Sequence, residues 1–376
     1  MKNYNHILHK ATTLLLTAAA ALSLCLLTGC NREDLPETGK YNTMIVLRGD
    51  GTKALDPDEA KSIVIYAFSS STGDLVGYLY ETNINGREIF PMNLTAGGQI
   101  DFYVILNPVC NGFEIIDGNN RVEFDSHEGI TPDIIKSWKL RRTDDTPGKA
   151  VPMSNLEKQV DGNHNPTDKS NRTFEVVANR NSWQEIPIQV TRAVSKVEVW
   201  FWANDNLPES NDAGFNQNHQ YTAINNMILT DPVNITEVFL PQGENADDYI
   251  DAENPKTTMN DTPYDGLNGG RFKPYTSGAF YSEEYFRLIW EEYILPNTFD
   301  GTTTLDVSYA HYSWDGWGWF GGWKTDYKKN KTIELPYGPR NTKIIVWCQL
   351  NDNIDRSFTY EVVDWDEETI DIPAFD

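Results

Sequence analysis

The amino-acid sequence predicts an all-β protein with a minor helical part, organised as two tandem β-sandwich domains. Its 376 residues are enough for two domains at about 100–200 residues each. Short runs of β-branched and aromatic residues recur every 8–12 residues or so, with turn residues between them, as in sandwiches and not in βαβ units. Hydrophobic residues make up 39% of the chain and aromatic residues 12%, which suffices for ordinary cores.

The N-terminus has the features of an export signal. Two lysines precede Ala11–Leu27, which carries no charge and is shorter than the roughly 20 apolar residues that span a bilayer. Leu27–Cys30 (LTGC) resembles the bacterial lipobox, L-[AST]-[GA]-C. We therefore expect residues 1–29 to be a lipoprotein signal peptide, cleaved before an acylated Cys30. The alternative is plain secretion with an unmodified cysteine.

The stretch after Cys30 predicts the location of the protein. Asn31–Asp34 (NRED) resembles the surface-export signal of some outer-membrane lipoproteins, and Leu35–Lys40 contains Pro and Gly. Residues 30–40 are thus expected to form a flexible, lipidated tether. The expected location is the cell outer membrane, lipid-anchored and exposed at the surface, or a fimbrium.

The first sandwich is predicted over residues 41–190. Its strands are expected where apolar runs or alternating apolar residues lie between turn residues. These segments are Tyr41–Arg48, Ser62–Phe68, Leu75–Tyr80, Gln99–Leu106, Thr173–Val177 and the start of Ile186–Trp202. A short helix is predicted over Thr131–Arg142, and the polar stretch Asp144–Asn171 is interpreted as loop.

The second sandwich is predicted over residues 191–376. A weaker helix is expected over Ser282–Glu292, and Gln242–Gly270, rich in Asn and Asp, is interpreted as loop. The remaining predicted strands are Glu237–Leu240, Tyr293–Leu295, Thr303–Tyr309, Thr342–Leu350 and Phe358–Val363.

Charge and cysteine content limit the partners. Asp and Glu number 55 against 31 Lys and Arg, for a net charge of −24. Phosphate backbones would repel such a chain, so nucleic acid is not expected as a partner. After signal cleavage and lipidation only Cys110 and Cys348 remain. An exported chain could bridge them, but they are predicted to lie in different domains, so we expect two free, largely buried thiols.

An ordered set of motifs resembles the fimbrillin superfamily, the subunits and anchors of type V pili. The matching segments are SIVIYAF (62–68), LVGYLY (75–80), QIDFYVILNP (99–108), PMS (152–154), VTRAVSKVEV (190–199), EYILPN (292–297) and FTYEVVDW (358–365). The resemblance implies two transthyretin-like sandwiches, an N-terminal lipid, no enzymatic activity and no cofactor. It also implies polymerisation, in which one subunit donates a strand into a groove of its neighbour.

The resemblance assigns roles to particular residues. Pilins of this family are cut after a basic residue near the first strand, which makes Arg48 the candidate processing site and Lys53 a second option. The candidate donor strand carries Phe358, Tyr360 and Val362 on one face; it either completes its own sandwich or adds to another molecule. The implied partners are other pilus subunits and a host protein or glycan.

A tryptophan-rich segment supports an alternative function as a surface glycan-binding lipoprotein. It is expected to be a Gly-rich loop whose rings either pack internally or bind a glycan or partner; its tryptophans are Trp314, Trp317, Trp319 and Trp323. Residues 316–321 match G-x-G-x-x-G, but no amphipathic helix follows to receive a pyrophosphate. The four histidines of the mature chain lack metal-ligand spacing, so no metal site is expected.

Overall fold

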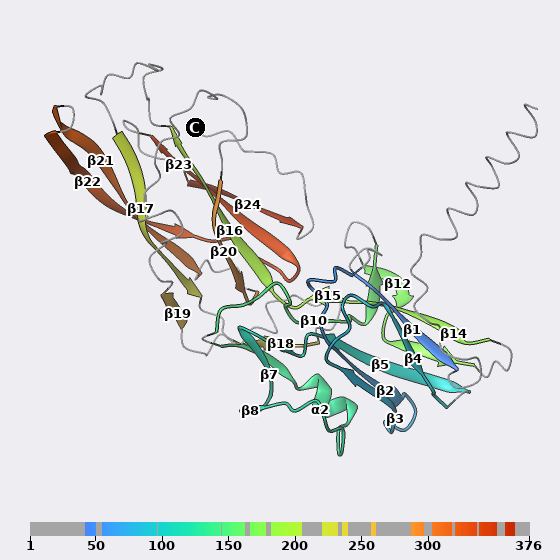
Figure 1. Ribbon diagram of the computed structural model, residues 1–376. Coiled ribbons are helices and arrows are strands. Elements are labelled where there is room, and N and C mark those ends of the chain that lie inside the picture. Colours follow the sequence, from blue (N-terminus) through green and yellow to red (C-terminus); the bar gives the residue numbers. More distant parts are fainter. Residues whose placement is uncertain are drawn as a thin grey trace, which may run out of the picture.

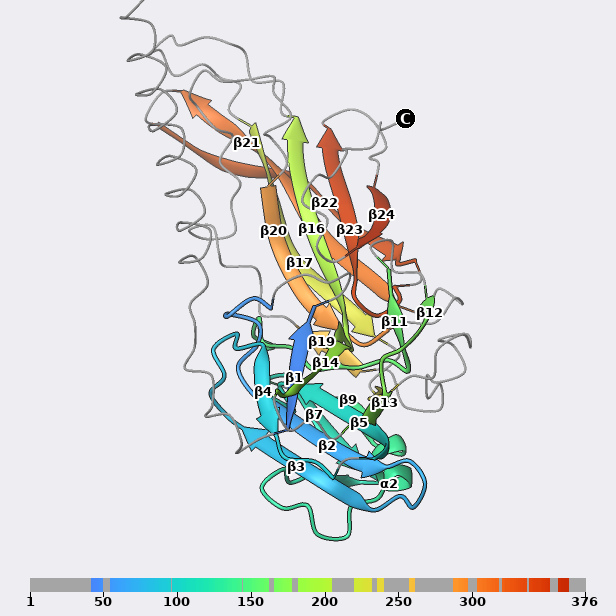
Figure 2. The same ribbon diagram turned by 90° about the vertical axis from the view of Figure 1, so that its right-hand side faces the viewer.

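The computed structural model describes residues 42–49, 55–95, 97–143, 145–161, 166–177, 182–204, 220–231, 235–239, 257–260, 287–296, 303–317, 320–336, 338–351 and 358–364. Nearly all secondary structure in these segments is strand, with one short helix. Two bodies of strands lie end to end (Figures 1 and 2). The predicted all-β fold with a minor helix is therefore confirmed.

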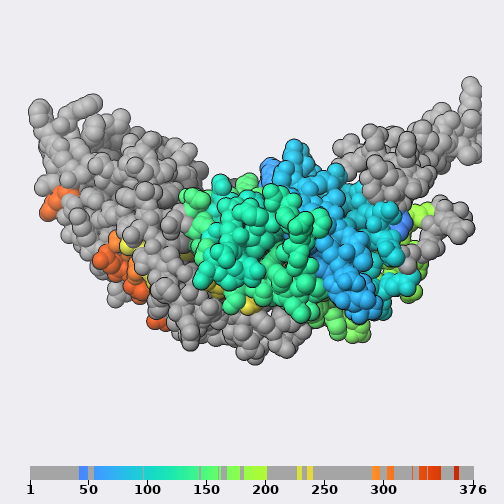
Figure 3. All heavy atoms as spheres, turned by 90° about the horizontal axis from the view of Figure 1, so that it is seen from below, coloured from blue at the N-terminus to red at the C-terminus, as the bar shows by residue number. Residues whose placement is uncertain are grey.

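The N-terminal body has three layers, with a six-stranded sheet in the middle. This sheet has the order β15 (Thr191–Arg192), β10 (Met153–Ser154), β5 (Gly98–Leu106), β2 (Ile63–Ser69) and β3 (Leu75–Glu81), with β13 (Thr173–Val176) also paired to β5. One outer layer is a sheet of β14 (Gln184–Gln189), β1 (Thr43–Arg48) and β4 (Ile89–Met92). The other contains α2 (Pro132–Lys136) and a sheet of β18 (Ile235–Glu237), β9 (Lys139–Arg142), β7 (Phe113–Asp117) and β6 (Val109–Cys110), with β8 (Asn120–Arg121) on β7. In the view from below, this body is the continuous blue-to-green surface (Figure 3).

Strand β2 shows that the middle layer is apolar on both of its faces. Val64 and Tyr66 pack toward α2, β7 and β9, whereas Ile63 and Ile65 pack toward β1 and β4. Residues that alternate along a strand point to opposite faces, so an uninterrupted apolar run suits a sheet covered on both sides. The predicted strand over 62–68 thus lies in the centre of the N-terminal body.

The helix predicted over Thr131–Arg142 is wrong in its second half. Thr131 caps α2 by accepting a hydrogen bond from the Ile134 amide, and α2 ends at Lys136. From Lys139 the chain is strand β9, which pairs with β7. Trp138 and Leu140, two residues apart, are both buried in the core beneath α2, and this spacing suits a strand and not a helix.

The C-terminal body is a sandwich of two four-stranded sheets. One has the order β20 (Arg287–Ile294), β16 (Ser195–Asn204), β23 (Thr342–Asn351) and β24 (Phe358–Asp364). The other has the order β19 (Thr257–Asn260), β17 (Gln220–Asp231), β21 (Thr304–Trp317) and β22 (Phe320–Glu334). Their core includes Val197, Leu229, Val307 and Val346. The predicted division at residues 190 and 191 stays a prediction; β18, from the later part, lies in the N-terminal body.

Several sequence expectations about local structure are corrected. The helix predicted over Ser282–Glu292 is strand from Arg287, because β20 pairs with β16 and places Ile294 in the core. The single run Ile186–Trp202 divides into β14, β15 and β16, since each joins a different sheet. The region interpreted as loop before Asn171 contains β10 and the hairpin of β11 (Lys158–Val160) and β12 (Pro166–Ser170), and β19 lies within the second predicted loop.

Candidate functional site

Strand β1 is the middle strand of its sheet. It pairs with β14 in parallel, from Thr43 opposite Gln184 to Arg48 opposite Gln189, and with β4 in the antiparallel sense. The side chains of Ile45 and Leu47 are completely buried in the core against the middle layer. Removal of β1 would therefore leave a groove with unpaired backbone groups on both sides and an apolar floor.

Arg48 ends β1 and is held by Glu88. One carboxylate oxygen of Glu88 forms an ion pair with the Arg48 guanidinium, and the other accepts a hydrogen bond from the Leu55 amide at 3.0 Å. The Arg48 carbonyl accepts a further bond from the Val190 amide at 2.9 Å. Glu88 thus holds the chain on both sides of the Arg48–Gly49 bond. Lys53, the second processing option, lies outside the described residues.

The start of β1 is fixed by Asn42. Its side-chain oxygen accepts a hydrogen bond from the Leu94 amide at 2.9 Å, and its side-chain nitrogen donates to the Leu94 carbonyl. Such a side chain reproduces the pairing of a sheet beyond the end of the strand. Residues at both ends of β1 therefore hold it in place.

Strand β24 is an edge strand of the C-terminal body and completes a sheet of its own chain. It pairs with β23 over its full length, with Tyr360 opposite Val346 and Val362 opposite Ile344. Val346 and Ile344 are buried in the core between the sheets, so Tyr360 and Val362 lie on that same face of the sheet. Tyr360 is nevertheless 48% exposed and Val362 40% exposed. For Phe358 only the pairing with Cys348 is described.

The tryptophan-rich segment is a β-hairpin, and the predicted Gly-rich loop is corrected. The strand expected to end at Tyr309 continues as β21 to Trp317, and β22 returns from Phe320. Trp314 is the register partner of Trp323, and Trp317 is that of Phe320. Continuous pairing of β21 with β22 extends the strands beyond the stretch that β17 covers. Trp319 lies outside the described residues.

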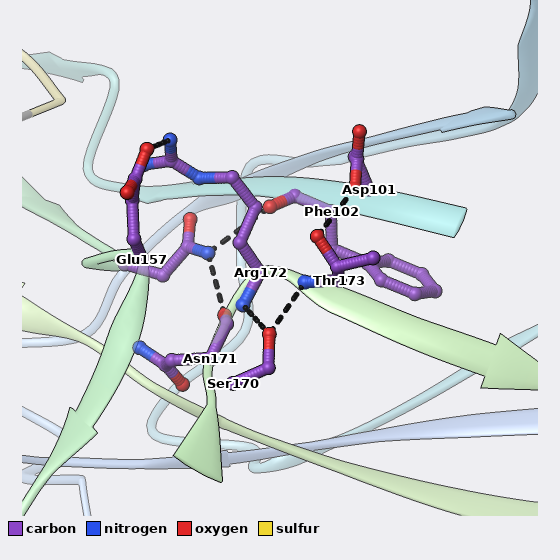
Figure 4. A network of polar contacts seen from close by, with 8 residues as sticks. Asp101, Phe102, Glu157, Ser170, Asn171, Arg172 and Thr173 are labelled. Atoms are coloured by element: carbon purple, nitrogen blue, oxygen red, sulfur yellow. Dashed lines mark hydrogen bonds and ion pairs between the residues drawn. The ribbon is translucent and has the colours of Figure 1, made fainter. Parts of the chain in front are cut away.

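A buried polar network joins strands of the N-terminal body, and the sequence analysis missed it. The Asn155 side chain accepts from the Val104 amide at 2.8 Å and donates to the Phe102 and Asn171 carbonyls. Arg172 forms an ion pair with Glu157 at 3.0 Å (Figure 4). In the same view the Ser170 hydroxyl accepts from the Arg172 and Thr173 amides. Asn155 and its partners in β5 are far apart in sequence, so no local pattern identifies them.

None of the residues with a shifted pKa has its pKa moved toward neutral pH, so none of them is a candidate acid or base for catalysis there. Burial, with smaller contributions from Tyr80 and Asp125, raises the pKa of Tyr78 to about 12. Burial likewise raises the pKa of Tyr66 and of the Cys348 thiol. Cys110 and Cys348 are both free thiols, as the sequence predicted. In the described segments no three His, Cys, Asp or Glu side chains form a group able to hold a metal ion.

Cys30, the predicted lipidation site, lies outside the described residues, and its acylation stays a prediction. Among the helices that the structure describes, none has the length and apolar character needed to cross a membrane.

The comparisons with known proteins identify the fold. No family model and no curated protein matches the sequence. A candidate cell adhesion protein from Parabacteroides distasonis is similar in structure, with a TM-score of 0.51 and 14% identity over 88% of this chain and 98% of that one. A candidate cell adhesion protein from Bacteroides eggerthii has a TM-score of 0.49, with 11% identity over 86% of this chain and 96% of that one. A fimbrilin from Porphyromonas gingivalis has a TM-score of 0.47, with 11% identity over 87% and 98%. On the first of these similarities, the chain shares the fold of the Parabacteroides distasonis protein.

Proposed function

We propose that this protein is a non-enzymatic, lipid-anchored adhesive subunit or anchor of a cell-surface pilus, of the fimbrillin type. Its N-terminus resembles a lipobox ending at Cys30, its sequence motifs resemble the fimbrillins, and it shares the fold of a candidate cell adhesion protein. Its partners are other pilus subunits, the outer membrane through the lipid, and a host protein or glycan. The two roles differ at Arg48: a subunit cut after Arg48 loses β1 together with the lipid on Cys30 and joins its neighbours by strand donation, whereas an anchor escapes the cut and keeps its lipid.

The position of β1 carries this proposal. A strand with neighbours on both sides, Ile45 and Leu47 in the core and a basic residue at its end can be released by a single cut after Arg48. The vacated groove then accepts a strand from a second copy by the backbone pairing of β-augmentation. Each buried backbone group left unpaired costs about 1–3 kcal/mol, which favours refilling.

Cutting the mature chain after Arg48 is expected to convert the monomer to oligomers. The purified protein is treated with an arginine-specific protease, the new N-terminus at Gly49 is verified by sequencing, and mass is followed by size exclusion with light scattering. The Arg48→Gln variant serves as the control, because it should resist cleavage at this bond and stay monomeric. A cleaved protein that remains a monomer contradicts strand donation into the β1 groove.

Glu88→Gln is expected to speed cleavage after Arg48 about two- to fivefold, the effect of losing one partly exposed ion pair. The variant frees the Arg48 guanidinium to enter a protease subsite. Glu81→Gln is the matched control, since Glu81 pairs with Arg87 at similar exposure and away from the cut. The measurement is the initial rate of appearance of the Gly49 terminus at limiting protease. Equal rates in the two variants would show that Glu88 does not restrain processing.

A second candidate function, glycan binding, is favoured by the tryptophan hairpin. Trp314 and Trp323 occupy paired positions on adjacent strands, as a stacking platform requires of the backbone. Glycan binding at this hairpin is compatible with a pilus subunit, because the hairpin and strand β1 belong to different bodies (Figure 1).

A further inference from the structure

Residues Ile235–Phe239, which we name the clasp, follow strand β17 of the C-terminal body yet pair with the N-terminal one. Strand β18 runs antiparallel to β9, with Thr236 opposite Leu140. The pairing extends past β18, since the Val238 amide donates to the Trp138 carbonyl at 3.1 Å. Figure 1 shows β18 among the strands of the N-terminal body. The clasp thus contributes a strand to the sheet of the other body.

The end of the clasp is buried inside the N-terminal core. Phe239 is 5% exposed and packs edge-on against Tyr103, with ring centroids 5.2 Å apart. The Arg172 guanidinium lies 4.8 Å from the Tyr103 ring centroid and 5.6 Å from that of Phe239. The Ser154 hydroxyl donates to the Val238 carbonyl at 2.6 Å. These contacts join the clasp to the polar network of Figure 4.

The C-terminal body also binds this segment. Arg340, just before β23, donates to the Val238 carbonyl at 2.9 Å and to the Glu237 carbonyl. A guanidinium with two bonds to successive carbonyls fixes the orientation of a backbone segment. The clasp is therefore bound by both bodies at once.

A buried ion pair reinforces this connection. Arg142 of β9 and Glu292 of β20 have side chains that are each 6% exposed and lie 2.9 Å apart. Arg142 also donates to the Tyr293 carbonyl at 2.6 Å. The free energy of a buried ion pair depends strongly on its geometry and on its additional hydrogen bonds. Rotation of one body against the other would disturb that geometry, so the pair resists it.

We propose that the clasp makes the two bodies one cooperatively unfolding, hinge-free unit. A load applied to either body is then carried across β18 and Phe239 as well as through the chain connection between β14 and β16. The inference rests on contacts within the described residues and is independent of processing at Arg48 and of any ligand.

The test measures unfolding of the full chain in urea by hydrogen exchange with mass spectrometry, with β2 reporting on one body and β23 on the other. In the unmodified protein both strands are expected to unfold at one midpoint. In Phe239→Ala the two midpoints should separate, and the β9 amides that pair with the clasp should exchange about 100-fold faster, the scale of a lost buried phenylalanine. Arg340→Met, which removes the two bonds from Arg340 to the clasp and leaves Phe239 in place, should give a smaller separation and is the variant to use if Phe239→Ala does not fold.

Phe90→Ala is the matched control. Phe90 is fully buried, and a guanidinium, that of Arg87, lies over its ring as Arg172 does over Phe239, but its contacts belong to the N-terminal body alone. This variant should lower the midpoint of both bodies together. Two separate midpoints in the unmodified protein overturn the proposal. So does coincident unfolding in both clasp variants, because the coupling then runs elsewhere.

Discussion

Deleting Phe358–Asp376 from protein cut after Arg48 is expected to abolish assembly and leave a monomer. The deleted segment contains β24, whose Phe358, Tyr360 and Val362 alternate along the strand. Three apolar residues at this spacing match the inward positions of β1, of which Ile45 and Leu47 are completely buried. Without β24, the groove left by β1 lacks the proposed donor strand.

The exposure of the two strands supports β24 as the proposed donor. Tyr360 and Val362 are already 48% and 40% exposed, so release of β24 uncovers little further apolar surface. Its backbone pairing with β23 is lost on release and regained in the groove. Filling the groove, by contrast, buries backbone groups on two sides and restores a core strand, so the exchange favours the donated state.

The measurement is light scattering of the cut, truncated protein beside the cut, full-length one. Two single variants distinguish the contribution of each face of β24 to assembly. Tyr360→Ser should weaken assembly, whereas Glu361→Gln, on the opposite face and within 3.2 Å of the Trp347 indole nitrogen, should retain it. Oligomers formed by the truncated protein would refute donation by this strand.

Replacing Cys30 with alanine is expected to move the protein entirely out of the membrane fraction. The thiol is the acylation point of the Leu27–Cys30 lipobox, and each buried CH₂ of an acyl chain contributes about 0.8 kcal/mol of membrane affinity. Several acyl chains together make a stable anchor, and their loss leaves no comparable apolar group in the tether. The result is read by fractionation and by the mass of the mature chain.

Cys25→Ala is the control for the lipidation test. Cys25 lies within the apolar run and leaves with the signal peptide, so this variant should be anchored like the unmodified protein. A Cys30→Ala protein that stays in the membrane fraction and uncleaved would show that anchoring does not depend on a lipobox.

Strand positions in the N-terminal body were predictable from the sequence wherever one local pattern dominates. The run over 62–68 is apolar on both faces. In Gln99–Leu106, burial alternates at first and is continuous from Phe102 onward. Both segments are strands of the middle layer. The free state of Cys110 and Cys348 was also expected, because the two were assigned to different predicted domains. In these segments, apolar residues occupy the buried positions over one short run of neighbours, so the local pattern is enough to identify the strand.

The secondary-structure prediction failed where local sequence signals favour a helix but pairing with a distant strand favours a β-strand. Thr131–Arg142 has a helix-capping residue at its start and apolar residues compatible with a helix. Its second half is nevertheless strand β9, because it pairs with β7 and packs in the core beneath α2. Arg287–Glu292 was expected to belong to a helix, yet backbone pairing with β16 makes it part of strand β20. Tertiary pairing outweighs weak local propensity in both cases.

The sequence by itself determined the all-β class and the positions of several main strands, and it supplied the predicted export signal and the candidate residues of the strand exchange. Only the tertiary structure decided that β1 is a middle strand, that β24 is an edge strand and that Phe239 enters the opposite core. The physical reason is that hydrophobic periodicity specifies which face of a strand is buried, whereas neighbours in a sheet are selected by backbone pairing between distant segments. That pairing leaves no pattern in either segment alone.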